Sequence, residues 1–276
     1  MNQIAQMPRV TSTWLGIREA ADAAARSGEL VALVRRHVTA GPRAVIHDLG
    51  CGTGAMGRWL AALLPGDQHW IMHDRDPDLL ERATAEMIEK SADGSAVTVE
   101  TRLGDATQLT AADLDGATLV TASALLDLLT RDEVERIAAA CAGARCPALL
   151  TLSVVGRVDL SPADPLDARI GAAFNAHQRR GVGDRILLGP DAVEAAADAF
   201  SRHGARTYVR PSPWRLGADQ VEVLSAWFVG WLAAAVEQDP SLAVAAAGYS
   251  HRRLIDIAER RLEVTVHHQD LLARHE

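Results

Sequence analysis

Apolar residues follow two spacings along this chain. Short runs of apolar, often β-branched residues alternate with longer segments in which apolar residues recur every three to four positions. The first spacing is typical of strands, and the second is typical of helices that bury one face. Strands are predicted at residues 44–46, 68–73, 97–103, 117–122, 147–155, 205–210 and 262–267, and helices at 9–38, 56–64, 77–90, 132–143, 166–180, 190–203, 218–237 and 241–261.

This order of elements predicts the fold class. Helices separate the first five strands, and such an alternation is typical of parallel strands joined by helical crossovers. We therefore expect an α/β fold with a doubly wound, mostly parallel seven-stranded sheet and added helical lid segments. The ligand of such a sheet binds at the carboxyl ends of the strands.

A glycine-rich loop follows the first predicted strand and precedes a helix, with glycines at positions 50, 52, 54 and 57. A strand, a glycine loop and a helix together bring backbone N–H groups close to a nucleotide-like ligand. Residues 52–57 fit the G-x-G-x-x-G motif of dinucleotide-binding folds, and Asp74 lies near the distance of their ribose-binding acid. Residues 48–54 also fit a second motif, Asp-Leu-Gly-Cys-Gly-Thr-Gly, with an acid two residues before the first glycine.

Asp48 separates these two interpretations. NAD presents a pyrophosphate to the loop, and a carboxylate at this position would repel it. S-adenosyl-L-methionine (SAM) presents an ammonium group and a sulfonium cation, which an acid attracts. The string at 48–54 resembles the first motif, D-x-G-x-G-x-G, of class I SAM-dependent methyltransferases, which have a Rossmann-like fold. The resemblance covers about residues 44–155 by motif, and the remainder only by the order of elements.

The resemblance implies a set of SAM-binding residues. Asp74, at the end of the second strand, would accept hydrogen bonds from both ribose hydroxyls, whereas Asp76 could instead cap the helix that begins at Pro77. Asp105 would accept from the adenine amino group, and it also suits a helix N-cap. The implied cofactor-binding residues are Asp48, Gly50, Cys51, Gly52, Gly54, Asp74, Arg75, Asp105 and Ala106, together with Arg18, which either meets the SAM carboxylate or belongs to a solvated helix face.

Residues 123–129 lie where this family faces the transferred methyl group. They lack the N-P-P-Y signature of enzymes that methylate amide or base nitrogens, and they look like the S-x-x-L-x-x-L form of small-molecule methyltransferases. Asp127 is either a substrate contact there or the cap of the helix from Arg131. An aromatic stripe at helical spacing more often packs a core than binds a substrate. The candidate substrate contacts are Ser123, Asp127, Phe174, Trp227 and Trp231.

Methyl transfer displaces a leaving group that is already activated, so the protein mainly positions the nucleophile and excludes water. A hydroxyl or ammonium nucleophile must also lose a proton, and a base assists this step. His177 and Asp127 are the candidate catalytic bases, and His37 and His251 are weaker ones. A lone histidine is more often structural, which counts against His177 as well. Since no acidic or histidine residues have metal-ligand spacing, no cation is expected to be required.

Breaks in the alternation of elements predict how the chain is divided. The expected parts are an N-terminal helical cap (1–40), a SAM-binding Rossmann-like core (41–156), an insertion over the active site (157–186), the continued core (187–212), a helical lid (213–261) and the last core strand with the C-terminus (262–276).

Composition limits the partners. A formal charge of −8 and a pI near 5.7 argue against nucleic acid and anionic membranes. Three cysteines provide neither a disulfide framework nor a zinc ligand set. The first residues lack the pattern of a signal peptide, and the longest apolar run, 226–236, is shorter than the ~20 residues that span a bilayer. We expect a cytoplasmic enzyme with a small-molecule acceptor and, as one option, a homodimer.

Three functions remain open at this level. The first is SAM-dependent methyl transfer to a small molecule, at an undetermined oxygen, nitrogen or carbon atom. The second is methylation of a protein or, less favoured by the acidic balance, of RNA. The third is a different class, either a nicotinamide-dependent oxidoreductase, which Asp48 disfavours, or a non-catalytic SAM-binding protein.

Overall fold

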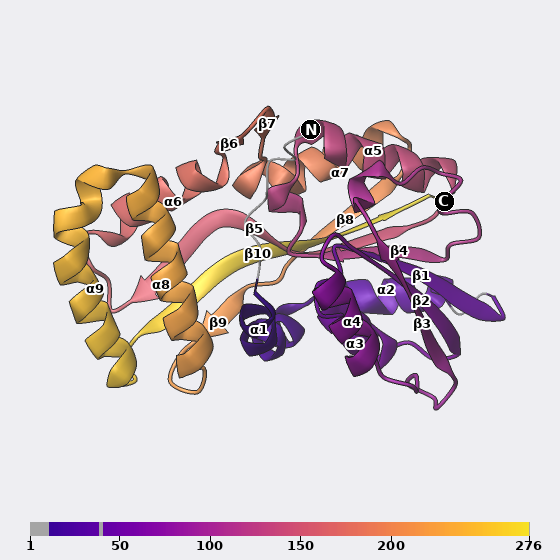
Figure 1. The fold of residues 1–276 in the computed structure, drawn as a ribbon, viewed down its shortest axis with the longest axis horizontal. Helices are drawn as coiled ribbons and strands as arrows, with labels where there is room; N and C mark the ends of the chain where they lie inside the picture. The colour runs from indigo at the N-terminus through magenta and orange to yellow at the C-terminus, as the bar shows by residue number, and fades with distance from the viewer. Residues whose placement is uncertain (1–10, 39–40, 276) are drawn as a thin grey trace.

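The computed structural model describes residues 11–38 and 41–275. Its main sheet follows the order β3-β2-β1-β4-β5-β10-β8, and β9 joins it by pairing with β10 (Figure 1). The strands from β3 to β5 are parallel, whereas β10 is antiparallel to both of its neighbours. The strands of this sheet are β1 (Arg43–Leu49), β2 (Asp67–Asp74), β3 (Val97–Leu103), β4 (Leu119–Ser123), β5 (Ala148–Ser161), β8 (Arg206–Pro211), β9 (Trp214–Leu216) and β10 (Glu263–Arg274).

This topology confirms the predicted doubly wound, mostly parallel α/β fold. Within the described residues the sheet has eight strands and not the predicted seven, because Trp214 to Leu216 pair with the first part of β10. Prolines at 211 and 213 precede this short strand. Because prolines usually mark loops, the pattern alone indicated a boundary there.

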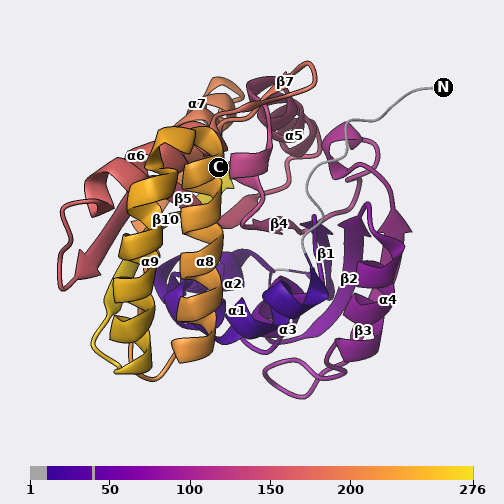
Figure 2. The same cartoon turned by 60° about the vertical axis from the view of Figure 1, so that its left-hand side comes forward.

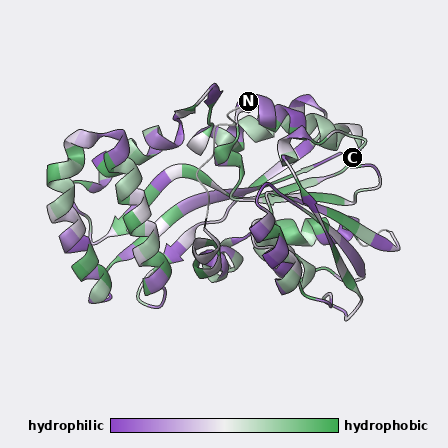
Figure 3. Ribbon diagram, viewed as in Figure 1, coloured by the Kyte–Doolittle hydropathy of each residue, from purple (hydrophilic) through white to green (hydrophobic). Residues whose placement is uncertain are grey.

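Helices cover both faces of the sheet (Figure 1). On one face Ile137 of α5 and Phe200 of α7 pack in a cluster with Leu150 of β5. On the other face a second cluster contains Leu60 of α3, Leu80 of α4 and buried residues of α2. Strands buried on both sides become continuous apolar runs, and green residues run through the central strands in Figure 3. The helices are α1 (Ser12–Ala25), α2 (Gly28–Val38), α3 (Ala55–Ala61), α4 (Pro77–Glu86), α5 (Arg131–Gly143), α6 (Asp167–Gln178), α7 (Ala192–Arg202), α8 (Val221–Gln238) and α9 (Ala243–Ala258).

β5 and β10 are long strands that continue past the rest of the sheet toward α8 and α9, which lie side by side (Figures 1 and 2). The predicted fifth strand ended at residue 155 and the predicted last strand at 267, and both ends were wrong. Val158 and Leu160 of the extension pack against a third hydrophobic cluster, which includes Phe228 and Tyr249. Exposed polar residues alternate with them. The predicted insertion over 157–186 rested instead on the prolines at 162 and 165 and on scattered acidic residues.

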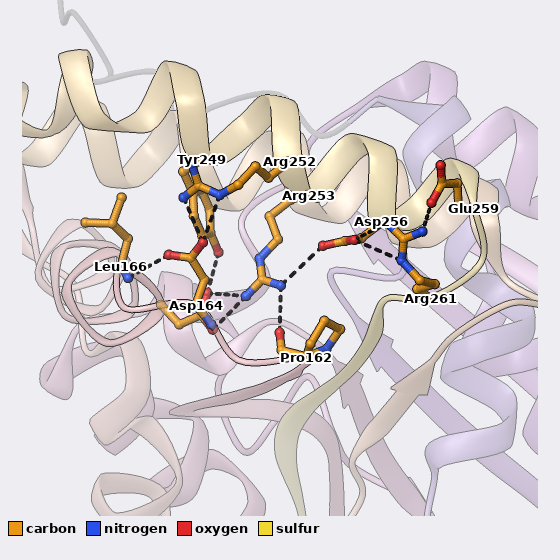
Figure 4. A network of polar contacts seen from close by, with 10 residues as sticks. Pro162, Asp164, Leu166, Tyr249, Arg252, Arg253, Asp256, Glu259 and Arg261 are labelled. Carbon is orange, nitrogen blue, oxygen red and sulfur yellow. Dashed lines mark hydrogen bonds and ion pairs between the residues drawn. The ribbon is translucent and has the colours of Figure 1, made fainter.

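α9 is fixed to the segment between β5 and α6 by a network of polar contacts (Figure 4). Arg253, only 2% exposed, donates to both carboxylate oxygens of Asp167 at 2.7 and 2.8 Å and to the Pro162 carbonyl at 2.7 Å. The neighbouring Arg252 donates to Asp164 at 2.7 Å nearer the surface. These contacts join the predicted insertion and the predicted lid into one packed unit.

Two smaller differences concern local structure. The helix predicted to reach residue 90 ends at Glu86, because Met87 adopts an extended conformation with ψ of 140° and Lys90 bridges to Ala96. A short hairpin, β6 (Gly181–Val182) and β7 (Arg185–Ile186), follows α6. Across residues 11–38 and 41–275, each helix is too short or too polar to cross a membrane.

Candidate functional site

The glycine loop joins β1 to α3 in a conformation that suits glycine. Gly50, Gly52 and Gly54 have φ of +62°, +56° and +82°, where L side chains are strained. Gly57 instead lies within α3, and a Cβ there would approach the Met72 side chain to 2.5 Å. The three glycines with left-handed backbone are therefore those of the D-x-G-x-G-x-G motif, and Gly57 is required for close packing.

Asp74, at the end of β2, lies directly beside this loop. Its carboxylate accepts hydrogen bonds from the Gly52 N–H at 2.9 Å and from the Asp76 N–H at 3.0 Å. Asp76 caps α4 by accepting from the Asp78 N–H. The structure thus makes Asp76 the helix cap and leaves Asp74 at the loop, where its carboxylate oxygens retain lone pairs for a ligand.

Asp48 is fully buried in β1. The Thr121 hydroxyl donates to its Oδ1 at 2.7 Å, whereas Oδ2 has no hydrogen-bond partner among the described residues. Burial raises the pKa of Asp48 to about 7, against the opposing effects of the Thr121 hydrogen bond and of the Arg26 charge. Because a buried acceptor without a partner is costly, this oxygen suits a donor that a ligand brings.

Two arginines at α1 differ in what they bind. Arg18 donates through Nε and Nη2 to the Asp22 carboxylate at 3.0 and 3.1 Å, so its role toward a ligand carboxylate stays a prediction. Arg26, at the C-terminal end of α1, is only 6% exposed and donates through Nη2 to Ser123 Oγ at 3.1 Å. Its Nε and Nη1 have no partner in the part of the chain that the structure describes. Arg26 is not among the residues predicted from the sequence.

α1 also covers the glycine loop. A Cβ added to Gly52 would lie 2.9 Å from the Leu15 side chain. Arg58 of α3 donates to both Glu19 carboxylate oxygens, at 2.9 and 2.6 Å. The helix before the sheet is therefore held over the loop, where the predicted N-terminal cap was expected.

Asp105 follows β3 and caps a short 3-10 helix, Ala106–Gln108. It accepts from the Thr107 N–H at 3.0 Å and pairs with Arg75 at 2.6 Å. Burial raises the pKa of Asp105, but the hydrogen bonds from Arg75 and Thr107 outweigh it and hold the pKa below its usual value. The helix-cap interpretation is therefore confirmed, while contacts of Asp105, Ala106 and Arg75 with adenine stay predictions. Cys51 is buried, and burial raises the pKa of its thiol, so the thiol stays protonated, while its backbone N–H donates to the His73 carbonyl at 2.9 Å.

A cavity of about 190 Å³ lies beside the segment that follows β4, and we call it the Asp127 cavity. Asp127 lies in a short 3-10 helix, Leu126–Leu128, at its wall. Just before this helix, the Leu125 side chain lies 3.0 Å from where a Cβ of Gly50 would be. The same short segment therefore borders the glycine loop and the cavity. The cavity is lined by Asp127, Leu128, Phe174, His177, Gln178, Arg180, Leu187 and Ala234.

The predicted alternative for Asp127, the cap of the helix from Arg131, is wrong. Thr130 is the N-cap of that helix and forms a reciprocal capping box with Glu133. Burial raises the pKa of Asp127 to about 6. A carboxyl group with that pKa is ionised near neutral pH and is still basic enough to accept a proton.

His177, the other predicted base, also lines the cavity. The Arg180 Nη1 donates to His177 Nδ1 at 3.0 Å, which assigns the proton of the neutral ring to Nε2. Burial, with the Arg180 charge, lowers the pKa of His177. Its accepting nitrogen is thus already occupied, and catalytic roles for His177 and for Asp127 stay predictions.

Trp227 and Trp231 lie in the packed cluster of α8 and not in the cavity lining, with 9% and 2% of their surfaces exposed. Their rings stack with centroids 5.3 Å apart, and Phe174 packs on Trp231 at 6.5 Å. Phe174 is the member of this aromatic group that reaches the cavity. The geometry therefore corresponds to core packing for both tryptophans, and their contact with a substrate stays a prediction.

The remaining candidates lie elsewhere. Ser123 accepts its hydrogen bond from Arg26 at the end of β4, on the side of the glycine loop. His37 is exposed at the end of α2 beside Pro147, and His251 is exposed on α9. Among the described residues, no three His, Cys, Asp or Glu side chains are grouped so that they could hold a metal ion.

The comparisons with known proteins concern the same part of the chain. A family described as "Methyltransferase domain" matches residues 46–147, which include Asp48, the glycine loop, Asp74, Asp105 and Asp127. No curated protein sequence matches. Three solved structures resemble the chain, each at 14% sequence identity. Cyclopropane synthase MmaA2 from Mycobacterium tuberculosis has a TM-score of 0.46, and the match covers 89% of this chain and 83% of that chain. A SAM-dependent methyltransferase from Geobacter sulfurreducens in complex with S-adenosyl-L-homocysteine has a TM-score of 0.45 with coverages of 98% and 100%, and magnesium protoporphyrin IX methyltransferase from Synechocystis PCC 6803 has a TM-score of 0.46 with coverages of 99% and 92%.

Proposed function

We propose that this chain, whose residues 46–147 match a methyltransferase domain, is a class I SAM-dependent methyltransferase. We further propose that its methyl acceptor is a small molecule bound in the Asp127 cavity. The observation that carries the proposal is the Asp127 carboxyl group in a cavity, on a short segment whose Leu125 side chain lies beside Gly50 of the glycine loop. A cavity of about 190 Å³ between the post-β4 segment, α6 and α8 suits a small acceptor. The net charge of −8 opposes RNA as the alternative.

The residues around the glycine loop fit SAM. Asp48 Oδ2, a buried acceptor without a partner among the described residues, suits the ammonium group. Nε and Nη1 of Arg26, which have no partner among the described residues, suit the carboxylate of SAM. Asp74 has lone pairs left for the ribose hydroxyls. We thus assign to Arg26 the role expected of Arg18, because Arg18 already pairs with Asp22.

Bound SAM would supply a methyl group on a sulfonium, whose sulfur would keep the electron pair of the C–S bond. Asp127 accepts the proton of the acceptor hydroxyl or amine as the lone pair of that group forms the new bond to the methyl carbon. Phe174, Leu128 and Leu187 surround the acceptor with apolar surface, which orients it and limits the access of water. The proton then leaves the Asp127 carboxyl group for solvent.

The proposal is tested by the fate of a labelled methyl group. The protein is incubated with [methyl-³H]SAM and a cell extract that has been separated into small-molecule, protein and RNA fractions. We expect label in the small-molecule fraction, lost with Asp127→Asn and retained with Asp132→Asn, which alters an exposed acid of α5. Label that appears only in the protein or RNA fraction would overturn the small-molecule assignment.

A further inference from the structure

The Asp127 cavity contains polar groups without partners. Gln178 Oε1 is buried and has no hydrogen-bond partner in the described ranges, and His177 Nε2 has only the exposed Glu237 carboxylate at 3.4 Å. The two residues are adjacent on the last turn of α6, and both line the cavity. Because unpaired buried polar atoms are costly, they indicate where a polar ligand makes its contacts.

Arg180 supplies the positive charge of this cavity. It is half-buried, and its Nη1 donates to Nδ1 and to the backbone carbonyl of His177, at 3.0 and 2.9 Å. Burial and the Arg180 charge lower the pKa of His177, which favours the neutral ring. The ring nitrogen and the carbonyl that accept from Arg180 therefore do not neutralise its charge. Among the described residues, none forms an ion pair with the Arg180 guanidinium.

The neighbouring arginines differ in this respect. Arg179, one residue earlier, forms a bidentate pair with Asp191 at 2.6 and 2.7 Å. Arg185, on the other side of the hairpin, pairs with Glu133 at 2.7 Å. A guanidinium that faces a cavity and has no carboxylate partner of its own is suited to bind a planar oxyanion from a ligand.

The other charges near the cavity do not neutralise Arg180. Asp127 lines the same cavity without an ion pair to Arg180. Glu237 lies 3.4 Å from His177 Nε2, but 74% of its side chain is exposed, so its charge is largely solvated. The cavity therefore presents a cation and a carboxyl group at separate positions, with Phe174, Leu128, Leu187 and Ala234 as apolar wall.

We infer that the acceptor carries an anionic oxygen group of the carboxylate class, which pairs with Arg180 while the methylated hydroxyl or amine faces Asp127. Gln178 Oε1 accepts a further hydrogen bond from the same ligand, and the apolar wall contacts its carbon skeleton. This inference rests on the proposed function. It names the chemical class of the acceptor, which the family does not specify.

Calorimetry on the protein saturated with S-adenosyl-L-homocysteine tests the inference. The probes are 4-hydroxybenzoate and 3-hydroxybutyrate, each compared with its neutral amide. We expect at least one carboxylate to bind and its amide to bind roughly ten- to hundredfold more weakly, because the amide lacks the charge that pairs with Arg180. Arg180→Gln should remove this preference, Arg180→Lys should keep part of it, and Arg179→Gln should keep all of it.

Several results would overturn the inference. They are equal binding of acid and amide, no binding of either carboxylate, or unchanged carboxylate affinity in Arg180→Gln. The affinity of each variant for S-adenosyl-L-homocysteine is measured first and serves as the check of folding. If Arg180→Gln does not fold, the acid-to-amide ratio of the wild type and of Arg180→Lys decides. Absence of S-adenosyl-L-homocysteine binding to the wild type would instead contradict the proposed function itself.

Discussion

Asp127 and His177 line one cavity, yet burial affects their protonation in opposite ways. Burial favours the neutral form of each group, so it raises the pKa of the carboxyl group and lowers that of the imidazole. Near neutral pH the carboxylate can still accept a proton, whereas the accepting nitrogen of the imidazole is used by Arg180. Residue type alone predicted both as bases, and only their surroundings distinguish them.

The first prediction concerns the pH dependence of turnover. Because Asp127 must be ionised to accept a proton and its pKa is raised to about 6, kcat should fall as the pH drops through about 6. Asp127→Asn should lower kcat by roughly 10²- to 10⁴-fold and abolish this acid limb. Glu237→Gln, which removes the exposed acid near His177, should retain the limb. An unchanged pH profile in Asp127→Asn would show that this residue is not the base.

A second prediction concerns Arg26. Arg26→Gln removes a charged donor proposed for the SAM carboxylate, so it should weaken S-adenosyl-L-homocysteine binding roughly ten- to hundredfold. Binding of 5′-methylthioadenosine, which lacks the amino-acid part, should change little. Calorimetry of both ligands measures the two effects. If Arg18→Gln and not Arg26→Gln produces this selective loss, the earlier expectation for Arg18 holds and our assignment is wrong.

The loop residues could be predicted from the sequence because their function is local. Asp48 and the three glycines lie within seven consecutive positions, and the backbone angles follow from glycine at those positions. Arg26 could not be predicted, since its hydrogen bond with Ser123 joins residues 97 positions apart. Arg180 was missed for a similar reason. Its lack of an ion pair depends on which acids the fold brings near it.

At the level of elements, the alternating pattern identified the strands of the parallel core and failed where the strands become half-exposed. β1 and β2 are buried on both faces and were recognised as apolar runs. The far part of β5 alternates exposed and partly buried residues, beyond the end of the parallel sheet. Its strand conformation depends on pairing with β10, about 100 residues later, which no local pattern specifies.

The network on α9 leads to a third prediction. Arg253 is almost fully buried and pairs with Asp167, so Arg253→Ala leaves a carboxylate without its counter-charge. Loss of one partner of a buried pair should lower the free energy of unfolding by about 3–5 kcal/mol. Arg252→Ala breaks the ion pair of an exposed arginine with Asp164 and should cost about 0–1 kcal/mol.

Urea denaturation of the wild type and both variants measures this difference. Equal losses for Arg252→Ala and Arg253→Ala would show that burial does not strengthen the contact. In that case, α9 and the segment before α6 would be held by their hydrophobic cluster alone.

For the whole molecule, the fold separates cofactor binding from acceptor binding. The glycine loop, Asp48 and Asp74 lie at or near the carboxyl ends of β1 and β2 under α1. The acceptor cavity is built by the segment after β4 together with α6 and α8, which pack on the extension of β5 and β10. Leu125 and Asp127 lie in the segment between the two sites. Under the proposed function, the core binds the cofactor and the added helices select the acceptor.

Calorimetric titration of the purified protein with S-adenosyl-L-homocysteine and, separately, with NAD tests the central claim most directly. The account predicts saturable binding of S-adenosyl-L-homocysteine and none of NAD at comparable concentration, because buried Asp48 suits an ammonium group and opposes a pyrophosphate. Asp74→Ala should weaken the S-adenosyl-L-homocysteine complex by roughly ten- to hundredfold. Tight binding of NAD, or failure to bind S-adenosyl-L-homocysteine, would contradict the account.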